Sequence, residues 1–316
     1  MKTNQVHSAL FGVAVGDALG VPVEFKSREF LIRFPVVDMQ EYGSHHQPKG
    51  TWSDDSSLTF CLSDSLCKRY DLNDIANKFL KWKKYASWTA RGQVFDIGIA
   101  TREAIYRIAQ GEDPVLCGGF DEEDNGNGSL MRILPLAFYL KGEEDISIIY
   151  QKVKEVSSIT HAHFRSVFAC FVYIVYTLEL LKAKNKFEAY NQTKITLEDF
   201  IDNKDFNKKE LQLFDRILKT NINELEEDKI HSGGYVVHSL EASLWCLLNS
   251  NTYEETVLKA VNLGSDTDTT AAITGGLAGL LYGYESIPEE WINVLARKND
   301  ITKLCDRLSE KYEIHN

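Results

Sequence analysis

The sequence predicts an all-α protein that folds as a single compact, orthogonal helical domain over residues 1–316. Apolar residues recur at helical spacing, as in Leu58, Cys61, Leu62 and Leu66, which places them on one face of a helix. No segment shows a convincing alternation of apolar and polar residues, the pattern of a half-buried strand. Hydrophobic residues make up 44% of the 316 residues, so a large core can form.

Two of the expected helices carry small residues on one face. Gly12, Gly16 and Gly20 are spaced by four and share one face of an N-terminal helix. A later helix, beginning near Thr269, contains Ala271, Ala272, Gly275, Gly276 and Gly279. Small side chains permit close approach, so we expect each of these helices to pack tightly against a neighbouring helix.

The remaining elements follow from caps and apolar runs. Ser53 is expected to be the N-cap of the helix that follows it, because acids occupy its first turn. The stretch Val167–Leu181 is almost continuously apolar, but its length indicates a buried helix and not a membrane span. Residues 183–230 are charged and poor in Gly and Pro, which predicts a solvated helical excursion; a lid or a partner contact is the alternative.

Composition limits the possible partners and compartments. The formal net charge of −11 argues against general binding to nucleic acid or to an anionic membrane surface. The six cysteines form no CxxC pair, which favours reduced core cysteines. Only Lys2 precedes the apolar stretch 9–15, and we see no run of about twenty apolar residues, so neither a signal peptide nor a membrane span is expected. We therefore predict a cytoplasmic protein.

Two acidic clusters lie more than two hundred residues apart. The first is Ser53-Asp54-Asp55 and the second is Asp266-Thr267-Asp268-Thr269. Neighbouring carboxylates raise each other's pKa unless a cation lies between them. Oxygen ligands suit hard cations such as Mg²⁺, Mn²⁺ or Ca²⁺. If the fold brings the clusters together, they form a dinuclear metal site.

Two superficial motif matches fail on their context. Residues 266–270 match the DxDxT nucleophile motif of haloacid-dehalogenase-like phosphatases, but that fold needs a strand before the motif and a large α/β domain after it. Residues 121–132 resemble an EF-hand loop, yet Glu123 occupies position three and Arg132 stands where a bidentate Glu is required. We reject both.

A glycine-rich segment and a histidine pair remain open. Asn127 and Gly128 begin a segment that ends at Arg132, whose backbone and guanidinium could contact a phosphate or ribose, although Asn-Gly pairs also mark ordinary turns. His161 and His163 could be a metal pair, but their separation of two suits a helix face poorly. A structural histidine is the alternative.

The ordered combination of motifs is more specific than any one of them. It comprises Gly16-Asp17-Ala18-Leu19-Gly20 with Pro22 and Glu24, Gly50 to Ser56, Asp96-Ile97-Gly98 with Thr101, Asn127 to Arg132, Thr160-His161, Gly234-Tyr235-Val236 and Gly264 to Thr269. This order resembles the ADP-ribosylglycohydrolase family over roughly residues 8 to 285. The resemblance implies an all-helical fold with two divalent cations, Mg²⁺ or Mn²⁺.

The resemblance also implies roles for individual residues. The metal ligands would be Ser53, Asp54, Asp55, Asp266, Asp268 and Thr269, with Ser53 standing where the family commonly has threonine. The catalytic acids would be Glu24, Asp54, Asp55 and Asp96. The residues along the ribose, diphosphate and adenine would be Asn127, Gly128, Ser129, Met131, Arg132, His161 and Tyr235. The family often has a polar residue at the position of Ile99, so its presence leaves acceptor recognition open.

The resemblance implies a hydrolase that removes ADP-ribose from a mono-ADP-ribosylated acceptor. The acceptor would be an ADP-ribosylated protein or a small ADP-ribose conjugate, most simply one linked through the N-glycosidic bond to arginine. The alternatives are an O-linked substrate, such as ADP-ribosyl-serine or O-acetyl-ADP-ribose, and a non-catalytic member of the fold that binds ADP-ribose. The intact acids argue against the second alternative. We expect a monomer.

Overall fold

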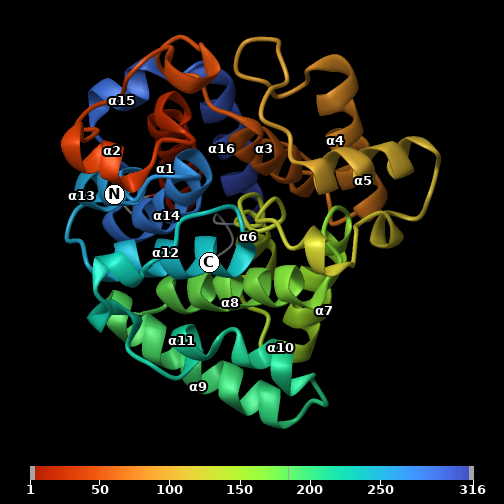
Figure 1. The fold of residues 1–316 in the computed structure, drawn as a ribbon. Coiled ribbons are helices and arrows are strands. Elements are labelled where there is room, and N and C mark those ends of the chain that lie inside the picture. Colours follow the sequence, from red (N-terminus) through yellow and green to blue (C-terminus); the bar gives the residue numbers. More distant parts are fainter. Residues whose placement is uncertain (1–3, 184, 313–316) are drawn as a thin grey trace.

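The computed structural model describes residues 4–183 and 185–312, and it consists of helices joined by loops (Figure 1). Its described residues contain isolated β-bridges but no strand, which confirms the predicted all-α class. In chain order the α-helices are α1 (Gln5–Gly20), α2 (Arg28–Arg33), α3 (Asp54–Leu66), α4 (Leu72–Tyr85), α5 (Ile99–Ala109), α6 (Leu136–Leu140), α7 (Ile146–Ser158), α8 (Phe164–Leu180), α9 (Lys186–Asp202), α10 (Lys208–Gln212), α11 (Asp215–Leu218), α12 (Val236–Leu248), α13 (Tyr253–Asn262), α14 (Thr267–Tyr282), α15 (Glu289–Val294) and α16 (Lys298–Tyr312).

Helices α1 and α14 pack backbone against backbone, although they come from opposite ends of the sequence (Figure 1). A Cβ atom at Gly12 would lie 2.2 Å from the carbonyl oxygen of Gly275, and one at Gly16 would lie 2.1 Å from that of Ala271. A Cβ at Gly279 would meet the oxygen of Ser8 at 2.0 Å. The two predicted small-residue faces therefore pack against each other.

Helix α1 is buried on all sides, as expected of a helix that is apolar around its circumference. The statement that the sequence has no run of about twenty apolar residues needs correction here. Residues Gln5–Val23 do form a segment long and apolar enough to span a membrane, with a mean hydropathy of 1.5. However, 94% of an 18-residue window in that stretch is buried within the protein, which is typical of a core helix.

Helix α8 is buried along almost its whole length, as its apolar run predicts. Its Phe168 and Phe171 belong to a cluster of aromatic rings that also includes Tyr150 of α7, Phe200 of α9 and Phe206. Helices α9 to α11 lie below α8, at the bottom of the view in Figure 1. Within the charged segment 183–230, α9 thus buries one face while its acidic residues remain exposed.

The cap predicted for α3 is present. The Ser53 side chain accepts a hydrogen bond from the backbone N–H of Asp55, and the helix begins at Asp54. All six cysteines are free and five are buried, in agreement with the prediction of reduced core cysteines.

We predict that Gly16→Ala lowers the free energy of unfolding by about 1–3 kcal/mol or more, because the new methyl group overlaps backbone that cannot move aside without separating α1 from α14. Denaturant unfolding followed by circular dichroism measures the change. Gly98→Ala is the matched control, since its Cβ meets nothing within 4 Å and its backbone needs no left-handed conformation. Equal stabilities of the two variants would contradict the packing argument.

Candidate active site

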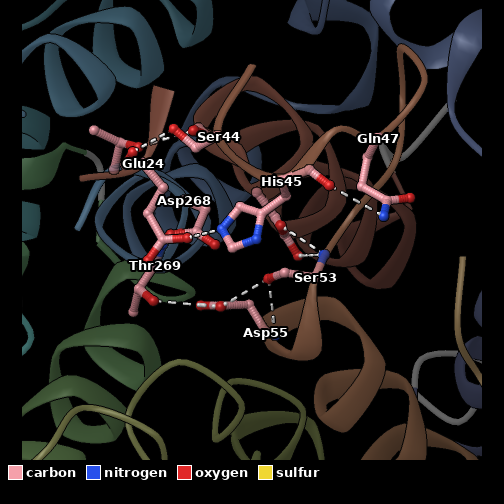
Figure 2. A network of polar contacts seen from close by, with 11 residues as sticks. Glu24, Ser44, His45, Gln47, Ser53, Asp55, Asp268 and Thr269 are labelled. Atoms are coloured by element: carbon pink, nitrogen blue, oxygen red, sulfur yellow. Dashed lines mark hydrogen bonds and ion pairs between the residues drawn. The ribbon is translucent and has the colours of Figure 1, made fainter. Parts of the chain in front are cut away.

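The two acidic clusters meet at the Asp55 carboxylate (Figure 2). Its Oδ2 accepts hydrogen bonds from the Ser53 hydroxyl at 3.0 Å and from the Thr269 hydroxyl at 3.3 Å. Asp55 and Thr269 are 214 positions apart in the sequence. Since Asp55 lies in the first turn of α3 and Thr269 in that of α14, the fold brings the starts of these two helices together.

Asp17, a buried acid on α1, fixes the start of α3. Its carboxylate accepts hydrogen bonds from the backbone N–H of Ser53 at 2.9 Å and of Ser56 at 3.0 Å, and from the Ser56 hydroxyl at 2.6 Å. Burial nevertheless raises the pKa of Asp17 to about 6. Sequence reasoning included Asp17 in a motif but gave it no role; a single acid inside an apolar helix was the available signal.

Each of the two clusters has a buried carboxylate oxygen that lacks a hydrogen-bond partner. Asp55 Oδ1 and Asp268 Oδ2 are buried without a hydrogen-bond partner. Burial and the neighbouring carboxylates raise the pKa of Asp54, Asp55 and Asp268 well above the usual range. Unsatisfied buried oxygens in such a group are the donor set that a divalent cation binds, so these residues fit a metal site.

A cavity of about 280 Å³ lies beside the clusters. Acidic residues predominate among its charged lining residues, and the described part of the chain contributes no lysine or arginine to the lining. The lining residues are Glu24, Asp54, Asp96, Gly98, Ile99, Ala100, Thr101, Glu123, Gly126, Asn127, Gly128, Met131, His161, Gly234, Asp266 and Thr269. When these acids are ionised, the cavity is strongly negative.

Two lining acids of the cavity, Glu24 and Asp96, lie close to His45, which itself does not line the cavity. A nitrogen of His45 and an oxygen of each acid all lie within 4.8 Å of one another, and an oxygen of Glu24 lies equally close to Asp266 and Asp268. Burial raises the pKa of Glu24 to about 7 even though the hydrogen bond from His45 lowers it. Sequence reasoning did not identify His45, because a loop, with no motif of its own, brings it to Glu24.

Asn127 connects the glycine-rich segment to the second acidic cluster. Its side-chain amide donates hydrogen bonds to Asp266 Oδ2 and to the Ser239 hydroxyl, both at 2.8 Å. The neighbouring Gly126 forms an antiparallel bridge with Tyr235. The segment is thus held at the cavity by side-chain and backbone contacts.

His161 lies in the cavity wall as an uncharged ring. Burial lowers its pKa to about 3, and its Nδ1 lies 2.9 Å from the Thr160 hydroxyl. Gly128 passes over the ring so closely that a Cβ there would lie 2.8 Å from His161 Cε1. Only glycine allows this approach, and His161 remains available as a neutral hydrogen-bonding group.

The structure does not place Arg132 in the cavity, contrary to the prediction that its guanidinium contacts an anion. Arg132 is fully buried, and its Nη2 donates hydrogen bonds to the Val156 carbonyl at 3.2 Å and to the Thr160 hydroxyl at 2.8 Å. Its guanidinium lies 4.6 Å from the centre of the Phe79 ring. Arg132 therefore supports His161 indirectly, because the Thr160 hydroxyl contacts both side chains.

Two other predicted substrate contacts also lie outside the cavity lining. Ser129 is fully buried and accepts a hydrogen bond from the Ser157 hydroxyl at 3.0 Å. The half-buried Tyr235 ring packs edge-on against His238, with ring centres 5.0 Å apart. By contrast, the predicted residues Asn127, Gly128, Met131 and His161 do line the cavity.

Arg165 connects the charged segment 183–230 to the edge of the site. It donates hydrogen bonds to both carboxylate oxygens of Glu210 on α10, at 2.7 and 3.1 Å. It also forms an ion pair with Glu122 at 3.0 Å. Glu122 precedes the cavity residue Glu123, so this segment supports the loop that borders the cavity.

We predict that the protein in EDTA becomes less stable as the pH rises from about 5.5 to about 8. Carboxylates with a raised pKa, such as Asp17 at about 6 and Glu24 at about 7, still hold protons in the folded state that the unfolded chain has released. The folded state then binds more protons, so rising pH favours unfolding. Thermal unfolding across this pH range measures the slope.

The double variant Asp54→Asn/Asp268→Asn is the control for this pH series. Its two amides cannot ionise, so its melting temperature should depend less on pH than that of the wild type. A wild-type melting temperature that rises towards pH 8 would contradict the electrostatic description of the site.

Comparison with known proteins identifies the family. The model of the family described as ADP-ribosylglycohydrolase matches residues 2–315. The chain is 32% identical to ADP-ribosylarginine hydrolase Tri1 of Pseudomonas putida, over 98% of this chain and 78% of the relative. It is 27% identical to the ADP-ribosyl-[dinitrogen reductase] glycohydrolase of Rhodospirillum rubrum, over 95% and 94%.

A solved structure supports the same assignment. A chain described as an ADP-ribosylglycohydrolase-related protein complex superposes with a TM-score of 0.79 and 31% sequence identity, covering 98% of this chain and 99% of that one. The match confirms the predicted fold, and the relatives confirm a glycohydrolase enzyme. The chain belongs to the ADP-ribosylglycohydrolase family.

Proposed function

We propose that this protein is a metal-dependent hydrolase that removes ADP-ribose from mono-ADP-ribosylated arginine by cleaving the N-glycosidic bond. The observation that carries this proposal is the meeting of the two acidic clusters at Asp55, beside an acid-lined cavity. The choice of arginine is supported by the similarity to a relative named as an ADP-ribosylarginine hydrolase.

The charge of the cavity supports both the metal and the acceptor. ADP-ribose carries a negatively charged diphosphate, and acids at the wall would repel it unless cations neutralise them. Arg132, at the end of the glycine-rich segment, is buried away from the cavity and does not supply a positive charge there. A guanidinium acceptor is itself a cation, so an acidic rim that includes Asp96 and Glu123 favours it.

Six residues would hold two divalent cations, Mg²⁺ or Mn²⁺. Their carboxylate and hydroxyl oxygens suit hard cations. They are Ser53, Asp54, Asp55, Asp266, Asp268 and Thr269. When bound, such cations supply positive charge that holds ribose hydroxyls and makes a nearby water more acidic.

The chain's own residues account for the remaining chemistry. Glu24 faces the cavity, and its pKa of about 7 suits a group that accepts a proton from the attacking water near neutral pH. The water oxygen bonds to C1 of the distal ribose while the C–N bond breaks and the guanidine leaves, through an oxocarbenium-like state. Asp96 would orient the ribose, and the neutral His161 with Asn127 and Gly128 would contact the rest of ADP-ribose.

The natural substrate would be an ADP-ribosylated protein or a small conjugate. We further propose that the chain acts as a monomeric single domain in the cytoplasm, with the segment 183–230 as a structural addition that supports the cavity edge through Arg165.

We predict release of free ADP-ribose from a mono-ADP-ribosyl-arginine protein with Mg²⁺ or Mn²⁺, and none in EDTA. Asp54→Asn should lower kcat/KM at least about 100-fold, because it removes charge where cations would bind. Chromatographic quantification of ADP-ribose measures the rate. A mono-ADP-ribosyl-serine peptide is tested in parallel under the same conditions.

The outcomes separate the alternatives. Release from serine alone would retain the metal-dependent hydrolase but overturn the arginine acceptor. ADP-ribose binding without turnover of either substrate would indicate a binding protein, and full activity in EDTA would refute metal dependence. The surface variant Lys68→Ala, on the turn after α3, serves as a folding control with activity expected to match wild type.

A further inference from the structure

We propose that His45 is a positioning residue, which holds the Glu24 carboxylate at the cavity wall in the orientation needed for hydrolysis. This inference rests on the proposed function and assigns a role to a residue that no sequence motif identifies. The argument combines the contact between the two side chains, the loop that carries His45, and the rings that fix its orientation.

His45 contacts Glu24 directly (Figure 2). Its Nε2 and Glu24 Oε2 form a hydrogen bond and ion pair. The Glu24 side chain is only 5% exposed, so a carboxylate there has lost most of its hydration. A hydrogen-bond donor and partial positive charge from His45 stabilise the ionised form in that setting and oppose rotation of the side chain.

The backbone conformation of the loop that carries His45, residues 42–47, places it against the segment that leads to Glu24. Tyr42, Gly43 and His46 all have positive φ angles, of 64°, 49° and 53°. A Cβ at Gly43 would lie 1.9 Å from the carbonyl oxygen of Pro22, so this turn packs against the segment leading to Glu24. Left-handed conformations at residues other than glycine are uncommon and persist where surrounding contacts hold them.

Two further hydrogen bonds lock the loop. The backbone N–H of Tyr42 donates to the Gln47 carbonyl at 2.6 Å, which closes the turn. The Ser44 hydroxyl donates to the Glu24 carbonyl oxygen at 2.6 Å (Figure 2). Adjacent residues of one loop therefore hold Glu24 by its backbone and by its side chain.

The His45 ring packs against two aromatic rings. Its centre lies 5.8 Å from that of Phe25 and 5.2 Å from that of Phe95. Phe25 directly follows Glu24, and Phe95 directly precedes Asp96. His45 therefore lies where the segments carrying the two cavity acids meet, and its removal would leave space for both to move.

We expect His45→Ala to lower kcat about 10–100-fold, because a misplaced reacting group costs rate more than binding, while KM changes less than about threefold. His45→Gln retains a side-chain N–H donor and should recover part of kcat. Glu41→Ala, at an exposed residue that directly precedes this loop, is the control and should stay close to wild type in both constants. Steady-state release of ADP-ribose from an ADP-ribosyl-arginine protein measures all of them.

A double-variant cycle tests whether His45 acts through Glu24. In the Glu24→Gln background, measured in single turnover, His45→Ala should cause little further loss of rate. The same cycle is measured on melting temperatures in EDTA, which needs no activity. There the double variant should lose no more stability than the less stable single variant.

Two results would overturn the proposal: losses that add in both cycles, or a change in KM with kcat unchanged. Failure of the proposed function is separable, because it would appear as an inactive wild type. In that case non-additive melting temperatures would retain the contact as structural only, and the positioning role would be refuted.

Discussion

The close approach of α1 and α14 is the constraint on which the site depends. Because glycines let the two backbones touch, the start of α14 lies directly beside the end of α1. A Cβ at Gly20 would lie 2.3 Å from Asp268 Cα, and the Thr267 hydroxyl donates a hydrogen bond to the Gly20 carbonyl at 2.8 Å. The segment that leaves α1 then places Glu24 within reach of Asp266 and Asp268.

The third element of this arrangement is α3, which α1 positions through Asp17. Four hydrogen bonds from Ser53 and Ser56 to one buried carboxylate fix where α3 begins. Two helix starts, each with a partial positive charge, therefore point their first-turn acids at the same place. These helix ends offset only a small part of the repulsion among the acids, and the pKa of several of them remains raised. The fold thus stores an electrostatic imbalance that bound cations would relieve.

Local patterns in the sequence predicted much of this arrangement, and contacts that depend on the whole fold explain what they missed. The glycine spacing in α1, the Ser53 cap and the oxygen-rich clusters could be recognised because each lies within a few consecutive residues. His45 could not, since its role depends on a loop with left-handed residues and on rings from two separate segments. Arg132 was expected at the cavity, but packing against Phe79 and bonding to Thr160 bury it.

The central claim is that α1 and α14 bring two distant acidic clusters together as one site for two cations. The most direct test is titration of the metal-free protein with Mn²⁺, followed by electron paramagnetic resonance and elemental analysis. The claim predicts about two Mn²⁺ per chain with a spectrum showing that the ions are magnetically coupled, as expected for close metal pairs. Binding of no Mn²⁺, or of a single uncoupled ion per chain, would contradict it.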